Sequence, residues 1–229
     1  MFGTIVNVIA ILIGSLCGSM FGKQFPDKVK NTIIQGVGLA ILLIGIQMAL
    51  ETKNVLLLIS CLVIGGFIGE IIDIEFKLER LGKYLESKLS KHEEGNFTKA
   101  FVTTSLIYCV GAMAIVGSLE GGLNGNYDIL FAKSMLDGIT AIIFASSLGI
   151  GVMFSAIPVL LYQGLITISA GFLEGVISDF VIGEVSAVGG LLIFGIGINI
   201  LGIKEIKVGN LLPGVLIAVP LSVLVEMFM

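Results

Sequence analysis

The chain has 229 residues, of which 56% are hydrophobic and 13% charged, and its formal net charge is −4. Soluble domains carry about a quarter charged residues, so this composition excludes an ordinary soluble protein and predicts an integral membrane protein whose main partner is the lipid bilayer. Lysine and arginine, 13 in all, are too few for a nucleic-acid surface, and we expect no nucleic-acid partner.

Residue types that hold metals or perform catalysis are scarce. The only histidine, His92, lies in the most charged stretch, and the three cysteines lie in apolar runs without a C-x-x-C motif. This inventory supports neither a disulfide framework nor a zinc site. The motifs H-E-x-x-H and G-x-S-x-G are also absent, so we expect no cofactor and no enzyme activity.

A transmembrane helix needs about 20 largely apolar residues. Runs of this kind predict an all-α membrane protein with about eight transmembrane helices, at 2–21, 32–50, 55–72, 100–118, 131–153, 157–177, 185–203 and 211–229. The first run follows no basic segment and precedes no A-x-A cleavage site, so we expect a retained span rather than a signal peptide.

The only clearly hydrophilic stretch is "EFKLERLGKYLESKLSKHEE", residues 75–94. Its leucines recur at helical spacing while charges occupy the other faces, which predicts an amphipathic helix on the cytoplasmic membrane surface. We assign it the role of a connector, with partner binding as the alternative.

The stretch "GAMAIVGSLEGGLNGN", residues 111–126, is unusually rich in glycine for a helix. It predicts either an extracytoplasmic turn or backbone that breaks into the membrane and offers N–H and C=O groups to a ligand. In the second case, Gly117, Gly121 and Gly122 would contact a solute, with Glu120 beside them.

Residues 138–173 contain no charge, yet two spans and a turn need about 40 residues. The fifth span must therefore begin before Gly138 and include Asp137, with Lys133 one turn earlier, and we expect the turn near 155–158. A charge at this depth usually faces a cavity or a partner. The pair predicts a buried solute site, or a structural ion pair in which Lys133 reaches the outer surface. Gln163 lies in the next span.

Two apolar segments resemble each other at an offset of 152 residues. "GLAILLIGIQMAL" (38–50) and "GLLIFGIGINIL" (190–201) share six of twelve positions, and Gln47 stands opposite Asn199. An odd number of spans separates the two copies, which predicts two inverted three-helix repeats around a central helix pair. Gln47 and Asn199 would form matching gates or interhelical hydrogen bonds.

The expected organisation is therefore repeat A at 1–74, the amphipathic connector at 75–98, the central helix pair with its glycine-rich loop at 99–155, and repeat B at 156–229. With the N-terminus outside, the inner loops hold eleven basic residues and the outer loops two. This count predicts a plasma (inner) membrane protein whose N- and C-termini are both extracytoplasmic.

Several stretches together resemble the YqgA/YdfK-like family of bacterial inner-membrane proteins. They are "GTIVN" (3–7), "GLAILLIGIQMAL", "CVGAMAIVGSLEGGLNGNYDILFAKSMLDG" (109–138), "SSLGIGVMFSA" (146–156) and "YQG" (162–164). The resemblance spans nearly the whole chain and implies a polytopic bacterial membrane protein, without a substrate or an established site. It adds weight to Glu120, Lys133 and Asp137, which match the family pattern.

These observations predict a secondary transporter or channel for a small polar or ionic solute. Asp137 and Lys133 would provide charge and proton coupling, with the glycine-rich backbone contacting the solute. The alternative is a non-transporting scaffold or regulatory protein, a homodimer acting through the 75–94 helix.

Overall fold

The computed structural model describes residues 1–22, 26–89, 96–109, 112–173 and 178–228, and every regular element in these ranges is helical. The chain forms two compact units. Unit 1 consists of Met1–Ile34, Leu78–Cys109 and Met113–Phe172, and unit 2 of Gln35–Lys77, Val110–Ala112 and Leu173–Met229. Each unit therefore combines residues from both predicted repeats.

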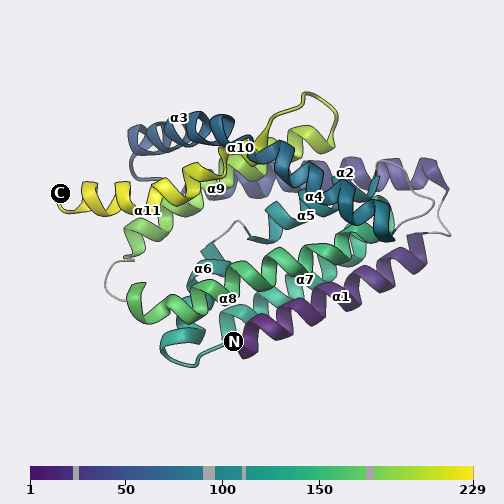
Figure 1. Ribbon diagram of the computed structural model, residues 1–229, viewed down its shortest axis with the longest axis horizontal. Coiled ribbons are helices and arrows are strands. Elements are labelled where there is room, and N and C mark those ends of the chain that lie inside the picture. Colours follow the sequence, from purple (N-terminus) through teal and green to yellow (C-terminus); the bar gives the residue numbers. More distant parts are fainter. Residues whose placement is uncertain (23–25, 90–95, 110–111, 174–177, 229) are drawn as a thin grey trace. The chain divides into compact units, whose positions relative to one another are not determined.

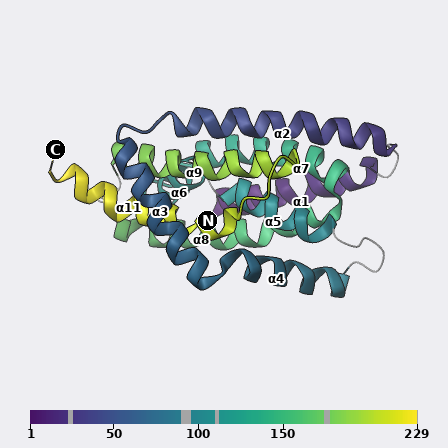
Figure 2. The ribbon, with the colours of Figure 1, turned by 90° about the horizontal axis from the view of Figure 1, so that it is seen from above.

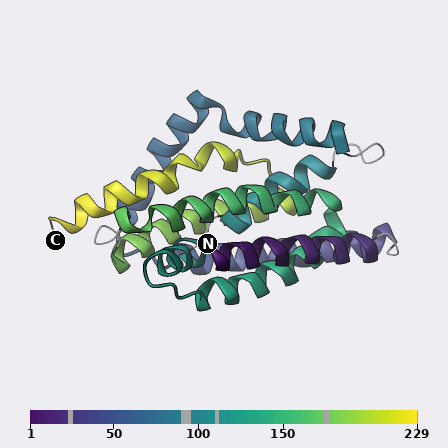
Figure 3. The same ribbon diagram turned by 60° about the horizontal axis from the view of Figure 1, so that its bottom comes forward.

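Unit 1 is built around a close pair of helices, α1 (Phe2–Gly22) and α7 (Asp128–Leu148), which run side by side (Figure 1 and Figure 3). Gly14 and Gly18 of α1 face the backbone carbonyls of Gly138 and Ile142 so closely that a β-carbon at either glycine would overlap them. The absence of side chains there lets the two backbones approach, as is common between membrane helices.

The glycine-rich stretch departs from its prediction, and the span predicted at 100–118 corresponds to a bent pair of helices. The structure has two helices here, α5 (Asn96–Cys109) and α6 (Ala112–Leu123), bent by 58° relative to each other. The expectation of non-helical backbone is thus wrong for 112–123, and in the described part of this stretch the turn follows Leu123. Close packing explains the helix: Gly122, for example, lies against the Thr167 carbonyl.

The fifth span begins at Asp128, which confirms that Lys133 and Asp137 lie within it. Its end differs from the expected turn near 155–158. Helix α7 ends at Leu148, Gly149 takes a positive φ of 90°, and a 3₁₀ helix η1 (Ile150–Ser155) leads into α8 (Ala156–Leu173). Glycine suits this backbone conformation because it has no β-carbon.

The described part of unit 2 is built mainly from α2 (Asp27–Ala49) from Gln35 onward, α3 (Val55–Ile72), α9 (Asp179–Ile200), α10 (Val208–Leu211) and α11 (Pro213–Glu226). Helix α3 packs against α10 and α11, and α9 packs against α11. Helix α4 (Ile74–Leu89) begins in unit 2, and its residues from Leu78 onward belong to unit 1. The helix that we predicted at 75–94 is thus present as far as Leu89, and 90–94 lie outside the described residues.

Within unit 2, α2 and α9 lie alongside each other (Figure 2). A β-carbon on Gly45 would lie 2.5 Å from the Phe194 nitrogen, and one on Gly190 would lie 2.6 Å from the Ala49 nitrogen. The segments in contact are the same two that resemble each other in sequence. Four residue pairs define their antiparallel register: Gly38–Leu201, Leu42–Gly197, Gly45–Phe194 and Ala49–Gly190.

Among the described residues, seven helices are long and apolar enough to cross a membrane, and the bent pair α5–α6 raises the number to eight if it forms one span. The predicted class, an all-α protein with about eight membrane-spanning helices, is confirmed in these terms.

Candidate functional site

An ion pair in α7 forms the centre of a polar cluster inside unit 1. Lys133 Nζ lies 2.6 Å from Asp137 Oδ2, and the two side chains are only 8% and 9% exposed. The i,i+4 spacing places both groups on one face of the helix. Lys133 thus turns inward to its partner, and the alternative in which it reaches the outer surface does not describe this structure.

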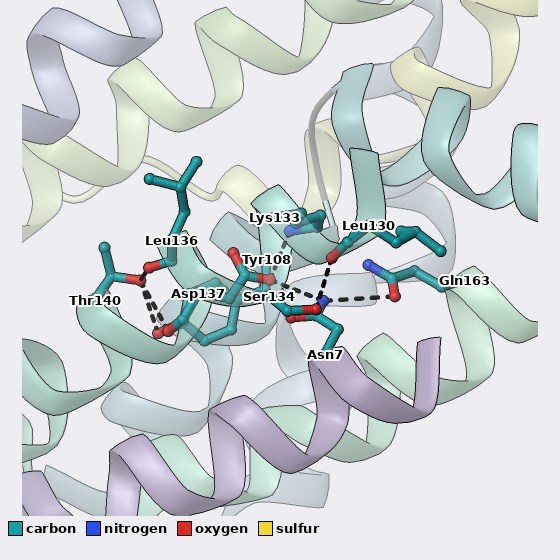
Figure 4. A network of polar contacts seen from close by, with 9 residues as sticks. All are labelled: Asn7, Tyr108, Leu130, Lys133, Ser134, Leu136, Asp137, Thr140 and Gln163. Carbon is teal, nitrogen blue, oxygen red and sulfur yellow. Dashed lines mark hydrogen bonds and ion pairs between the residues drawn. The ribbon is translucent and has the colours of Figure 1, made fainter. Parts of the chain in front are cut away.

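Helices α1 and α8 add one carboxamide each (Figure 4). Asn7 Nδ2 donates to Asp137 Oδ2 over 3.0 Å and lies 3.5 Å from Gln163 Oε1, which accepts a second, longer hydrogen bond. Asn7 and Gln163 are both 0% exposed. Four buried polar side chains from three helices therefore share one network, which we call the polar cluster: Asn7, Lys133, Asp137 and Gln163.

An aromatic residue of α5 borders the cluster. Lys133 Nζ lies 6.0 Å from the centroid of the Tyr108 ring, at the outer limit for a cation–π interaction. Thr140 Oγ1 of α7 lies 3.5 Å from the Tyr108 hydroxyl, while the backbone carbonyls of Leu136 and Asp137 lie closer to it, at 2.8 and 3.1 Å. Tyr108 is 1% exposed, so a buried aromatic ring lies on this side of the lysine.

The cluster contains polar atoms that lack a partner among the described residues. Asn7 Oδ1, an acceptor, and Gln163 Nε2, a donor, are both buried without a hydrogen bond, and so are the hydroxyls of Thr4 and Ser118 in the same unit. Burying such an atom unpaired costs about 1–3 kcal/mol. The cluster thus has one donor and one acceptor without a protein partner beside its buried ion pair.

Of the residues that we predicted to bind a solute, the structure brings Lys133, Asp137 and Gln163 together. All three predicted glycines have packing contacts instead, and that of Gly122 is with the Thr167 carbonyl. A β-carbon at Gly117 would lie 3.0 Å from the Leu130 side chain, and one at Gly121 would lie 3.0 Å from the Tyr127 ring. These glycines therefore let the helix pack closely against its neighbours.

Glu120 has a local partner, and the two repeated carboxamides belong to unit 2. Glu120 accepts a hydrogen bond from Asn124 Nδ2 at the end of α6. Asn199 Nδ2 donates to the Ile206 carbonyl and its Oδ1 accepts from the Ile206 nitrogen, both at 2.8 Å, so this side chain closes its own loop. Gln47 is exposed on α2.

Two residues of the site, Asn7 and Tyr108, were not predicted from the sequence. Both stand within apolar segments. A carboxamide in a membrane span needs a hydrogen-bond partner. By this criterion the sequence points to Asn7 as strongly as to Gln47. Its partner Asp137 is 130 residues away, and hydropathy does not show which spans meet.

Glu184 is a second buried carboxylate that the sequence did not single out. It belongs to α9 in unit 2 and is 1% exposed. Its two oxygens accept hydrogen bonds from the Thr52 hydroxyl (2.7 Å), the Lys53 nitrogen (2.6 Å) and the Asn54 nitrogen (3.0 Å). This carboxylate therefore holds the loop between α2 and α3, and three donors stabilise its charge.

The end of the loop after α9 and the start of α10 are held in a comparable way by Glu70 of α3 and Glu75 of α4. Glu70 accepts from Lys207 Nζ at 2.5 Å and from Asn210 Nδ2 at 2.7 Å. The hydrogen bond and charge of Glu70 raise the pKa of the Lys207 ammonium above its usual value. Glu75 accepts from the Gly209 nitrogen, and its own nitrogen donates to Asn210 Oδ1. These contacts are structural, because every group in them has a protein partner.

Comparison with known proteins places the chain among uncharacterised membrane proteins. It is 37% identical over 221 residues to the uncharacterized membrane protein YdfK of Bacillus subtilis, covering 95% of this chain and 93% of that protein. It is 34% identical over 227 residues to the uncharacterized protein YqgA of Escherichia coli, covering 96% and 95%. No solved structure matches the chain. Residues 2–223 match the model of a family described as a protein of unknown function (DUF554), and the chain belongs to this family of multi-pass membrane proteins.

Proposed function

We propose that this protein is a secondary transporter or channel for a small polar or ionic solute in the plasma membrane, and that the polar cluster of unit 1 binds the solute. The observation that carries the proposal is the pair of unpartnered atoms, Asn7 Oδ1 and Gln163 Nε2, beside the buried ion pair of Lys133 and Asp137. Ionisable residues within membrane spans commonly mark the path of a substrate or ion.

A purely structural role accounts less well for the cluster. A buried ion pair is often no more stable than apolar residues of similar volume, so stability alone gives little reason to retain one. Asn7 and Gln163 add two more buried carboxamides, and each leaves one of its two polar atoms without a partner. A solute that pairs with these atoms removes the cost of burying them.

The packing of α2 against α9 supports an inverted-repeat architecture, which many secondary transporters have. Helix α2 begins at Asp27 and α9 at Asp179, a difference of 152 residues. The same offset relates the contacts between the two helices to one another. Gly38 contacts Leu201. Adding 152 to the first number and subtracting 152 from the second gives Gly190 and Ala49, which are also in contact.

The second pair of contacts behaves in the same way. Leu42 contacts Gly197, and the same operation gives Phe194 and Gly45, which are also in contact. Such an exchange is what a two-fold axis between antiparallel helices produces. In a transporter, this symmetry would provide two alternative states that open to opposite sides of the membrane.

The test is solute flux into liposomes that contain the purified full-length chain. We expect at least one solute of a broad panel to enter faster than in protein-free liposomes, and we expect Asp137→Asn to abolish the difference. Glu120→Gln, which neutralises a carboxylate elsewhere in unit 1, is the matched control and should leave the flux unchanged.

A panel in which the protein accelerates no solute would favour the scaffold alternative over a transporter. Flux that Asp137→Asn leaves unchanged would show transport by a route other than the polar cluster. Both results would overturn the proposal as stated.

A further inference from the structure

We infer that the solute is a small uncharged molecule that carries both a hydrogen-bond donor and an acceptor, of the urea or primary carboxamide class. This inference rests on the proposed function and narrows the solute from the wider class of polar or ionic molecules. It follows from the charge balance of the polar cluster and from which of its atoms lack partners.

The charges of the cluster cancel within the protein. Lys133 and Asp137 lie 2.6 Å apart and are both more than nine-tenths buried, so each is the counter-charge of the other. An ion entering this site would find no unpaired charge of opposite sign among the residues of the cluster. Burying an uncompensated ion is far more costly than burying a neutral polar group. The balance favours an uncharged solute.

The unpartnered donor and acceptor of the cluster are complementary to the hydrogen-bonding groups of an amide. Asn7 offers a free carbonyl oxygen and Gln163 a free NH₂ group, while the Nδ2 of Asn7 and the Oε1 of Gln163 face each other at 3.5 Å (Figure 4). Urea and primary carboxamides carry a C=O acceptor and N–H donors within one small plane. Such a molecule can donate to Asn7 Oδ1 and accept from Gln163 Nε2.

The Asp137 carboxylate strengthens this match. Both of its side-chain hydrogen bonds, from Lys133 and from Asn7, fall on Oδ2. Within the described residues Oδ1 accepts no hydrogen bond, so it can accept from a second N–H of the solute. A purely apolar solute would leave Asn7 Oδ1 and Gln163 Nε2 unpaired, at the cost that buried polar groups carry.

The experiment compares solute classes in liposomes containing the full-length protein. Influx of urea and acetamide is followed by light scattering, and influx of rubidium, chloride and the zwitterion glycine by isotope uptake. We expect accelerated influx of urea and acetamide only. Gln163→Leu should lower their protein-dependent flux about tenfold, because losing one well-formed hydrogen bond weakens binding by about this factor.

Matched controls are available on α2, where Gln35 and Asn31 are exposed. Gln35→Leu is the control for Gln163→Leu, and Asn31→Leu is the control for the second test variant, Asn7→Leu. Both controls should leave the flux unchanged. Gel filtration establishes that each variant is folded. If Gln163→Leu does not fold, Gln163→Met is measured in its place. The influx of the different solutes through the wild-type protein then tests the solute class.

The outcomes separate the two proposals. Influx of ions or glycine alone would overturn the solute class but retain a transporter. Influx of no solute would overturn both. Urea and acetamide influx that is insensitive to both Gln163→Leu and Asn7→Leu would show that the solute does not bind at the polar cluster.

Discussion

Lys133 and Asp137 form an ion pair across one turn of α7, and Asn7 of α1 donates to the same carboxylate oxygen as the lysine. The pair is therefore tied to a second helix. Because both charges are buried, removing either one leaves the other without compensation. Single and double substitutions of the pair should therefore differ in their effect on stability.

Lys133→Met should lower the free energy of unfolding by about 3–5 kcal/mol, the usual cost of leaving one buried charge unpaired. The double variant Lys133→Met/Asp137→Leu should recover most of this loss, because no charge then remains buried. Thermal unfolding in detergent, followed by circular dichroism, measures both. Additive losses in the double variant would contradict a coupled pair.

The sequence predicted much of this site and little of its surroundings, for a physical reason. Lys133 and Asp137 lie one turn apart just before an uncharged region, and helical geometry alone brings them together. Asn7 meets Asp137 only through the packing of α1 on α7, and hydropathy, which measures preference for lipid, does not determine which helix faces meet.

The glycine-rich segment shows a different limit. Glycine disfavours helices in isolation, which predicted irregular backbone for the glycine-rich stretch 111–126. In the structure Ala112–Leu123 are helical, because a residue without a side chain lets α6 approach its neighbours, as at Gly122 and Thr167. A local propensity of about 1 kcal/mol per glycine is readily outweighed by tertiary packing.

The Glu184 carboxylate holds the loop between α2 and α3 through three donors. Glu184→Gln replaces one acceptor oxygen by an NH₂ group that faces donors, so we expect the free energy of unfolding to fall by about 2–3 kcal/mol. Hydrogen exchange at the Lys53 and Asn54 amides should accelerate as well. Glu120→Gln, at a half-buried site, should change stability by less than about 0.5 kcal/mol.

The contact between α2 and α9 predicts opposite effects of one substitution at two glycines of α2. A β-carbon on Gly45 would lie 2.5 Å from the Phe194 nitrogen, so Gly45→Ala should destabilise by about 1–3 kcal/mol through overpacking. No described atom lies within 4 Å of the corresponding position at Gly36, and Gly36→Ala should stabilise by about 0.5–1 kcal/mol. Equal shifts in melting temperature for the two variants would refute the close approach.

The two repeated carboxamides should differ in their contribution to stability. Asn199 makes two hydrogen bonds to the Ile206 backbone, so Asn199→Leu should cost about 1–2 kcal/mol and increase proteolysis of the loop after α9. Gln47 is exposed on α2, and Gln47→Leu should stay within about 0.5 kcal/mol of the wild type. A larger loss for Gln47→Leu would indicate a partner for this side chain.

The proposed inverted repeat makes a prediction about topology that needs no solute. Lys53 and Glu205 are separated by the repeat offset of 152 residues, and both are exposed in loops that join equivalent helices. Inverted copies place them on opposite sides of the membrane, with Lys53 outside according to the distribution of basic residues. In a variant without native cysteines, Lys53→Cys should react in intact cells with a membrane-impermeant maleimide, whereas Glu205→Cys should react only after the membrane is opened. Labelling of both from the same side would mean that the copies are parallel, because an even number of spans would then separate them.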